Sequence, residues 1–176
     1  LIEKLIKAEY NRQLKGLEMI PSENHTSADV LTALGSRLTD KYSEGYPGQR
    51  YYGGCEVVDQ VENIARDRAK QLFGVSHANV QAYSGSPANQ AIYFALVDPG
   101  DTVMGLSLFY GGHMTHGLKV NFSGTTYNSV QYTTDKDGFL DYDAIADLAL
   151  KEKPKLIVAG TTAYPRIIDW KKLRKI

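Results

Sequence analysis

The stretch from Lys41 to Gly54 is the feature that most restricts how this chain can fold. It reads Lys-Tyr-Ser-Glu-Gly-Tyr-Pro-Gly-Gln-Arg-Tyr-Tyr-Gly-Gly. Glycine and proline at this density exclude a regular helix or a central strand. Four aromatic rings also bring too much apolar surface for a disordered linker. The tract therefore predicts an ordered loop that is either a binding loop or a tyrosine-rich surface loop packed on the core or on a partner subunit.

Composition places few other limits on the chain. It has 176 residues, enough for one domain with a core, and its 20 basic and 20 acidic residues leave no net charge. A charge balance of this kind does not favour binding to nucleic acid or to a membrane surface. The single cysteine, Cys55, allows no internal disulfide, and there is neither a membrane-spanning apolar run nor a leader. The expectation is a soluble, cytoplasmic protein.

Helical and strand-like segments alternate through most of the chain. Apolar spacing predicts helices over residues 1–15 and 56–73, the second ended by Gly74, and Thr26-Ser27 can cap a short helix. Further along, strands expected at 79–81, 102–106, 129–133 and 155–160 alternate with helices expected at 87–97 and 141–151. This order predicts an α/β fold with a mostly parallel sheet. We expect residues 1–40 to form a helical arm and residues 41–176 to form a larger domain.

Both ends of the chain fall within helical patterns. The sequence starts with Leu1 inside an amphipathic pattern, and it stops at Ile176 in the second turn of a helix that begins near Asp169. Domains usually end in exposed linkers rather than partway along an apolar helical face. The expectation is a piece of a longer protein, with an incomplete larger domain.

The sequence Ser84-Gly85-Ser86-Pro87 is the best candidate for an anion site. It follows an expected strand and opens an expected helix, with Ser86 as N-cap and Pro87 at the first helical position. Free N–H groups, hydroxyls and the positive end of the helix dipole then converge on one anion. A plain helix cap without a ligand is the alternative. No Walker-type spacing is present, so a nucleoside triphosphate is not expected.

Two histidines three residues apart, His113 and His116, lie between glycines in the sequence from Gly111 to Gly117. Such a pair can ligate a metal on a helix, but no third ligand lies nearby, so no metal site is predicted. Flanking glycines favour a flat group lying against one ring. His116 is expected to be structural.

Five motifs lie along the chain: Ile20–Asn24, Lys41–Gly54, Tyr83–Asn89, Gly111–Gly117 and Leu156–Tyr164. In order and spacing they resemble serine hydroxymethyltransferases, which are pyridoxal 5'-phosphate (PLP) enzymes of fold type I. The resemblance implies part of a three-layer α/β/α large domain. It also implies transfer of the hydroxymethyl group of L-serine to tetrahydrofolate, giving glycine and 5,10-methylenetetrahydrofolate. It further implies a homodimer, or a multiple of dimers, with shared active sites.

The resemblance also implies which residues hold the cofactor. Ser84, Gly85 and Ser86 would bind the PLP phosphate, and Tyr42 would reach that phosphate from the neighbouring subunit. His113 would stack on the pyridine ring and assist proton movement. Thr162, where the family usually has serine, would hydrogen-bond the phenolic oxygen of the cofactor.

Substrate contacts are implied in the same way. Ser22 would help to hold the amino-acid carboxylate, and Glu44 would donate a proton during hydroxymethyl transfer, its pKa raised by the loop around it. Proton handling would involve Tyr52 as well, and Tyr51 and Tyr52 would line the substrate and folate pocket. The folate-side loop would include Leu108, Gly112 and Met114.

Three functional residues of the family have no counterpart here: the lysine that binds PLP covalently, the aspartate at its ring nitrogen and the arginine at the substrate carboxylate. In the family they follow the matched region, so these 176 residues alone are expected to be inactive. Two alternatives stay open. One is another PLP lyase or aldolase of the same fold, such as a threonine aldolase, and the other is a truncated, non-catalytic oligomerisation module.

Overall fold

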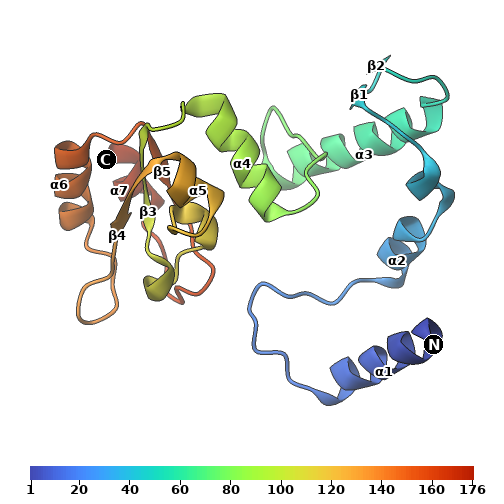
Figure 1. Cartoon of the computed structure of the whole chain (residues 1–176), viewed down its shortest axis with the longest axis horizontal. Coiled ribbons are helices and arrows are strands. Elements are labelled where there is room, and N and C mark those ends of the chain that lie inside the picture. The colour runs from blue at the N-terminus through green and yellow to red at the C-terminus, as the bar shows by residue number, and fades with distance from the viewer. The chain divides into compact units, whose positions relative to one another are not determined.

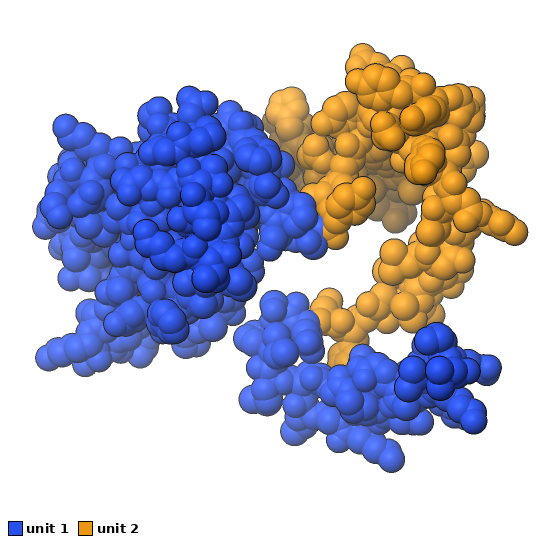
Figure 2. All heavy atoms as spheres, in the orientation of Figure 1, with its two compact units in different colours: residues 1–23, 84–176 blue, residues 24–83 orange.

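The computed structural model describes residues 1–176 (Figure 1). Its α-helices are α1 (Ile2–Lys15), α2 (Ala28–Leu34), α3 (Glu56–Phe73), α4 (Gly85–Leu96), α5 (Phe122–Thr126), α6 (Tyr142–Glu152) and α7 (Trp170–Lys175). The strands are β1 (Gly45–Tyr46), β2 (Gln49–Arg50), β3 (Thr102–Leu106), β4 (Asn128–Tyr132) and β5 (Leu156–Val158). Short 3-10 helices are η1 (Arg37–Asp40), η2 (Leu108–Tyr110) and η3 (Met114–His116). The chain divides into two compact units, Leu1–Glu23 with Ser84–Ile176, and Asn24–Tyr83 (Figure 2).

A parallel sheet in the order β4-β3-β5 organises the first unit. The central strand β3 pairs with β4 along its whole length, from Thr102 opposite Asn128 to Leu106 opposite Tyr132. Because β3 is covered on both faces, its residues from Val103 to Leu106 are all buried. Helices and a parallel sheet confirm the predicted α/β class.

Alternate residues of β3 serve two separate apolar clusters. Met104 and Leu106 pack with Ile145 of α6, and residues of α7 join the same cluster. Val103 points the other way, toward Tyr93 of α4 and Tyr127 beside α5. The sheet therefore lies between helices on two sides, which gives three layers.

Connections leave neighbouring strands toward opposite faces of the sheet. The chain after β3 passes to α5, which packs with the Val103 cluster, whereas the chain after β5 passes to α7, on the Met104 side. In open α/β sheets, ligands bind at the carboxyl ends of the strands, where connections diverge in this way. The segments from Ser107 to Gly117 and from Gly160 to Thr162 lie at this edge.

The second unit is built around α3 and a short antiparallel hairpin of β1 and β2. Gly45 pairs with Arg50 in this hairpin, and Pro47 and Gly48 make its turn. Gly74 ends α3 in the left-handed conformation, as the sequence predicts. Ser27 caps α2 through its side chain, also as predicted.

Two sequence predictions about local structure are wrong. The strand expected at residues 79–81 does not form, since these residues pair with no other strand. The helix expected to begin at Pro87 begins at Gly85 instead, with Ser84 as its N-cap. None of the helices is long and apolar enough to cross a membrane.

Candidate functional site

The amino end of α4 presents hydrogen-bond donors that have no partner in the chain. Ser84, not Ser86, is the N-cap, and its side chain makes no capping hydrogen bond. The backbone N–H groups of Gly85 and Ser86 are likewise unpaired, and Pro87 has no N–H to pair. Nothing lies within 4 Å of the position that a Cβ of Gly85 would occupy. Two free N–H groups, two hydroxyls and open space together suit a small anion.

Close backbone packing fixes the segment after β3. Gly111 has φ +99°, in the left-handed region, and Thr162 donates its N–H to the Gly111 carbonyl at 2.9 Å. A Cβ on Gly112 would collide with the carbonyl of Leu106. Because residue 112 is glycine and has no Cβ, the chain can turn closely across the end of β3, and His113 follows directly after this turn.

Two contacts from Thr115 hold one nitrogen of His113. The backbone N–H of Thr115 donates to His113 Nδ1 at 3.1 Å, and Thr115 Oγ1 lies 2.8 Å from the same nitrogen. In the neutral ring this leaves the proton on Nε2. Thr115 Oγ1 in turn accepts a 2.8 Å bond from Asn89 Nδ2, and the Thr115 carbonyl accepts one from Tyr93 Oη. His113 is thus connected to the helix that carries the anion site.

His116 is buried, and one of its ring nitrogens is already engaged in a hydrogen bond within the loop. Its Nδ1 accepts the backbone N–H of His113 at 3.2 Å. Burial lowers the pKa of His116 to about 4, and the charge of nearby His113 lowers it to a lesser degree. A hydrogen bond with the backbone of Leu106 raises this pKa, but its effect is the smallest of the three. A neutral, buried imidazole that braces the loop fits the structural role expected of it.

Thr162 follows β5 and contacts the glycines that precede His113. Its Oγ1 donates to the carbonyl of Gly112 at 2.9 Å, across fifty residues of sequence. The hydroxyl proton is therefore already engaged, and a bond from Thr162 to the phenolic oxygen of a cofactor would require it to turn away from Gly112. That predicted contact stays a prediction.

The remaining residues predicted for the first unit occupy simpler positions. Leu108 opens η2 and is half-buried, while Met114 opens η3 and is 42% exposed. Ser22 lies in an exposed turn that is closed by a bond from Glu23 N to the carbonyl of Ile20 at 3.1 Å. No side-chain hydrogen bond holds Ser22, so its predicted carboxylate contact stays a prediction.

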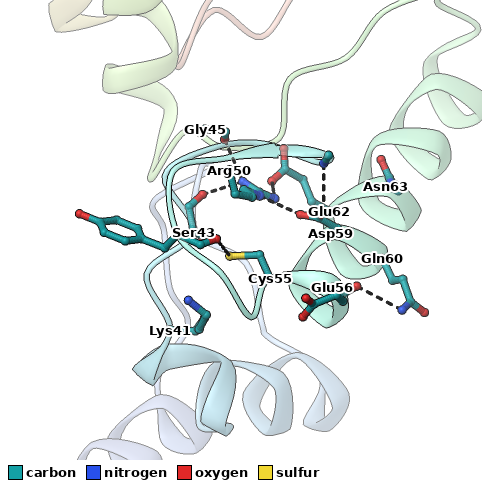
Figure 3. A network of polar contacts seen from close by, with 12 residues as sticks. Lys41, Ser43, Gly45, Arg50, Cys55, Glu56, Asp59, Gln60, Glu62 and Asn63 are labelled. Atoms are coloured by element: carbon teal, nitrogen blue, oxygen red, sulfur yellow. Dashed lines mark hydrogen bonds and ion pairs between the residues drawn. The ribbon is translucent and has the colours of Figure 1, made fainter.

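In the second unit, Arg50 organises the tyrosine-rich loop. Its guanidinium pairs with two carboxylates of α3, Asp59 at 2.8 Å and Glu62 at 2.6 Å (Figure 3). The Glu44 side chain is exposed and makes no hydrogen bond. The sequence signal for this arrangement is limited to spacing: Asp59 and Glu62 are three apart and share a helix face, which marks a pair of acids but does not identify their partner.

The tyrosines of the loop are mostly exposed. The rings of Tyr42 and Tyr52 lie 6.0 Å apart at a tilt, and Tyr51 is 82% exposed. Cys55 is buried beneath them, with its Sγ near the carbonyl oxygens of Tyr42 and Tyr52. A hollow of about 850 Å³ adjoins the loop, lined by residues that include Tyr42, Glu44, Arg50, Val61 and Tyr83.

The structure therefore gathers the predicted site residues into two sets. One contains the α4 amino end, His113 and Thr162, linked by bonds through Asn89, Thr115 and Gly112. The other contains Tyr42, Glu44, Tyr51 and Tyr52 on one loop of the second unit. Sequence reasoning missed the side chains that support both sets: Asn89, Thr115, Asp59 and Glu62.

Comparison with known proteins identifies the family. The profile of the family described as serine hydroxymethyltransferase matches residues 1–176, the whole chain. The chain belongs to the serine hydroxymethyltransferase family. It is 59% identical over 175 residues to the serine hydroxymethyltransferase of Mycoplasmopsis agalactiae (strain NCTC 10123 / CIP 59.7 / PG2). That match covers 99% of this chain and 42% of the length of the relative.

Proposed function

We propose that the protein containing this chain transfers the hydroxymethyl group of L-serine to tetrahydrofolate, with PLP as cofactor. Family membership over the whole chain supports this reaction. The observation that carries it furthest is the unpaired amino end of α4, connected through Asn89 and Thr115 to His113. An anion site and a flat, oriented ring, joined by short bonds, suit a cofactor that is both phosphorylated and aromatic.

The residues present fit the cofactor in their chemistry. A phosphate would take the N–H groups of Gly85 and Ser86 and the hydroxyls of Ser84 and Ser86, at the positive end of α4. Tyr42 of a neighbouring subunit would add a phenol to the same phosphate. His113, with its proton on Nε2, would pack its ring against the pyridine. PLP, when bound, supplies the electron sink that allows a bond at the α-carbon of serine to break.

Proton handling would fall to the tyrosine-rich loop. The carboxyl group of Glu44 is exposed and makes no hydrogen bond within the chain, so it can contact a bound substrate, and it would serve as the proton donor of the transfer step when protonated. Tyr52 would assist it, and Tyr51 and Tyr52 would line the pocket for serine and folate. Ser22 would hydrogen-bond the serine carboxylate.

The folate side and the assembly complete the proposal. Leu108, Gly112 and Met114 would form the folate-side wall, which the half-exposed thioether of Met114 suits. We further propose a cytoplasmic homodimer, or a multiple of dimers, with shared active sites. The apolar faces of α1 and α2, which contain no buried residue in the isolated chain, support such an assembly.

The full-length protein tests this proposal in one assay. Purified with PLP, it should convert L-serine to glycine only slowly without tetrahydrofolate and much faster with it, and 5,10-methylenetetrahydrofolate should accumulate. A threonine aldolase would instead cleave L-threonine at a rate that tetrahydrofolate leaves unchanged. Absence of both activities in protein that binds PLP would reject the proposed transfer.

A further inference from the structure

One nitrogen of Arg50 holds the backbone on both sides of Glu44. Arg50 Nη1 donates to the carbonyl of Ser43 at 2.6 Å and to the carbonyl of Gly45 at 2.8 Å. The carbonyl of Glu44 itself accepts the N–H of Tyr51 at 3.1 Å. Three successive carbonyls are therefore bound, while the carboxylate of Glu44 between them is free.

Arg50 is itself fixed to α3. Its Nε donates to Asp59 at 2.8 Å and its Nη2 to Glu62 at 2.6 Å, and its side chain is only 4% exposed (Figure 3). The planar guanidinium thus has one edge on a rigid helix and another on the loop backbone. The backbone on either side of Glu44 is therefore held at a fixed position relative to α3.

Two further contacts hold the loop to the same acids. Asp59 accepts the backbone N–H of Gly48 at 3.0 Å, at the turn of the hairpin. Gln81 Nε2 bridges the Gly45 carbonyl and Glu62 Oε1, both at 2.9 Å. The hairpin is therefore anchored at its base and its tip, and the side chain of Glu44, the one acidic residue of the tract from Lys41 to Gly54, makes no hydrogen bond.

We propose that Arg50 is a positioning residue for Glu44, fixing where the carboxylate stands through the peptides on either side of it. This inference rests on the proposed function in one respect, the role of Glu44 in proton transfer. Lysine cannot substitute for Arg50, since a single ammonium group cannot bind two carbonyls and two carboxylates in one plane. Asp59 and Glu62 act through Arg50.

A double-mutant cycle in the full-length protein separates positioning from general stabilisation. Arg50→Lys should lower kcat by ~10-fold or more while KM for serine changes little, because a displaced acid slows the chemical step. In a Glu44→Gln background the same substitution should have almost no further effect on kcat. Equal fold-losses in both backgrounds, or an unchanged kcat in Arg50→Lys alone, would overturn the proposal.

Hydrogen exchange of backbone amides tests the geometry without any activity. Arg50→Lys should speed exchange at Tyr51 and Gly48, and Glu62→Gln, a milder change that leaves Arg50 in place, should do so to a smaller extent. Arg37→Lys is the matched control, since Arg37 is 98% exposed and pairs only with Asp40. Unchanged exchange in Arg50→Lys would show that Arg50 does not hold the loop. Wild-type turnover in Glu44→Gln would instead remove the proton role and, with it, the functional part of this inference.

Discussion

The two loops that carry the predicted site are held in place by opposite means. The segment from Ser107 to Gly117 depends on burial and uncharged hydrogen bonds, since Gly112, Thr115 and His116 are all buried. The tyrosine-rich loop leaves its rings exposed and depends on Arg50 between two carboxylates. Buried packing tolerates little change of shape, whereas a charged anchor depends on the protonation of its acids. The two loops should therefore fail under different conditions.

Gly112→Ala should have the largest effect. The new Cβ would overlap the Leu106 carbonyl, so β3 or the loop must shift, at a cost of about 3 kcal/mol in the free energy of unfolding. Gly53→Ala in the tyrosine-rich loop is the control, because nothing lies within 4 Å of its Cβ position. Urea unfolding measures both, and equal stabilities would contradict the packing account of the first loop.

Thr115→Val should have the next largest effect. It removes the hydroxyl between Asn89 and His113 from a side chain with no exposed area, leaving the Asn89 amide unpaired at about 1–3 kcal/mol. Thr125→Val removes an exposed hydroxyl and should change stability by less than about 0.5 kcal/mol. If both variants unfold at the same urea concentration, the hydrogen bonds that link Asn89, Thr115 and His113 do not contribute to the free energy of unfolding.

The pH dependence of the two loops should differ in its range. The pKa of His116 is lowered from 6.5 to about 4, so between these values the unfolded chain binds a proton that the folded chain does not. Stability should therefore fall as pH drops, by about 1–2 kcal/mol from pH 7 to pH 5. His116→Gln should abolish most of this slope in urea unfolding.

The ion pairs of Arg50 with Asp59 and Glu62 should stay intact between pH 7 and pH 5. Hydrogen bonds from Arg50, and then from the Gly48 N–H, hold the pKa of Asp59 below its ordinary 3.8. A lowered carboxyl pKa gives stability that is present above the ordinary value and is lost as pH falls through the folded one. Between pH 7 and pH 5, the protection of backbone amides against hydrogen exchange, taken relative to the intrinsic rate at each pH, should fall at Thr115 and Gly117 but not at Gly48 and Tyr51. An equal loss of protection at both loops would show that they share one anchor.

Ser86→Ala should change folding the least. Because Ser84 is the N-cap, loss of the Ser86 hydroxyl should alter the free energy of unfolding by less than about 0.5 kcal/mol. A phosphate bound there would lose a hydrogen bond to a charged group, so PLP should dissociate ~10-fold more readily from the full-length protein. Spectroscopic PLP titration beside apo-protein unfolding separates these effects. Unchanged PLP affinity would place the phosphate elsewhere.

Local signals predicted the elements that depend on neighbours in sequence. Apolar spacing predicts the bounds of α3 and the starts of α6 near Asp141 and of α7 near Asp169. All three appear in the structure, where both aspartates cap their helices. The start of α4 was misplaced because proline is tolerated throughout a first turn, where N–H groups are unpaired anyway. A strand at residues 79–81 was wrong because a strand also needs a partner, which periodicity does not reveal.

Site predictions show the same division. The motifs indicated which residues to examine, and the structure connects Thr162 with Gly112 across the ends of two strands. The sequence assigns no partner to Arg50, and in the structure its carboxylate partners are nine and twelve residues away on α3. Pairings of this kind depend on how a loop folds back on a helix, which no local pattern specifies.

The crowding around Gly112 also limits how this chain can change by mutation. Every amino acid other than glycine carries a Cβ, and here a Cβ meets the Leu106 carbonyl. Met114, two residues further on and half-exposed, has no such barrier. A random mutant library selected only for folded protein should contain many codons at Met114 and almost none but glycine codons at Gly112.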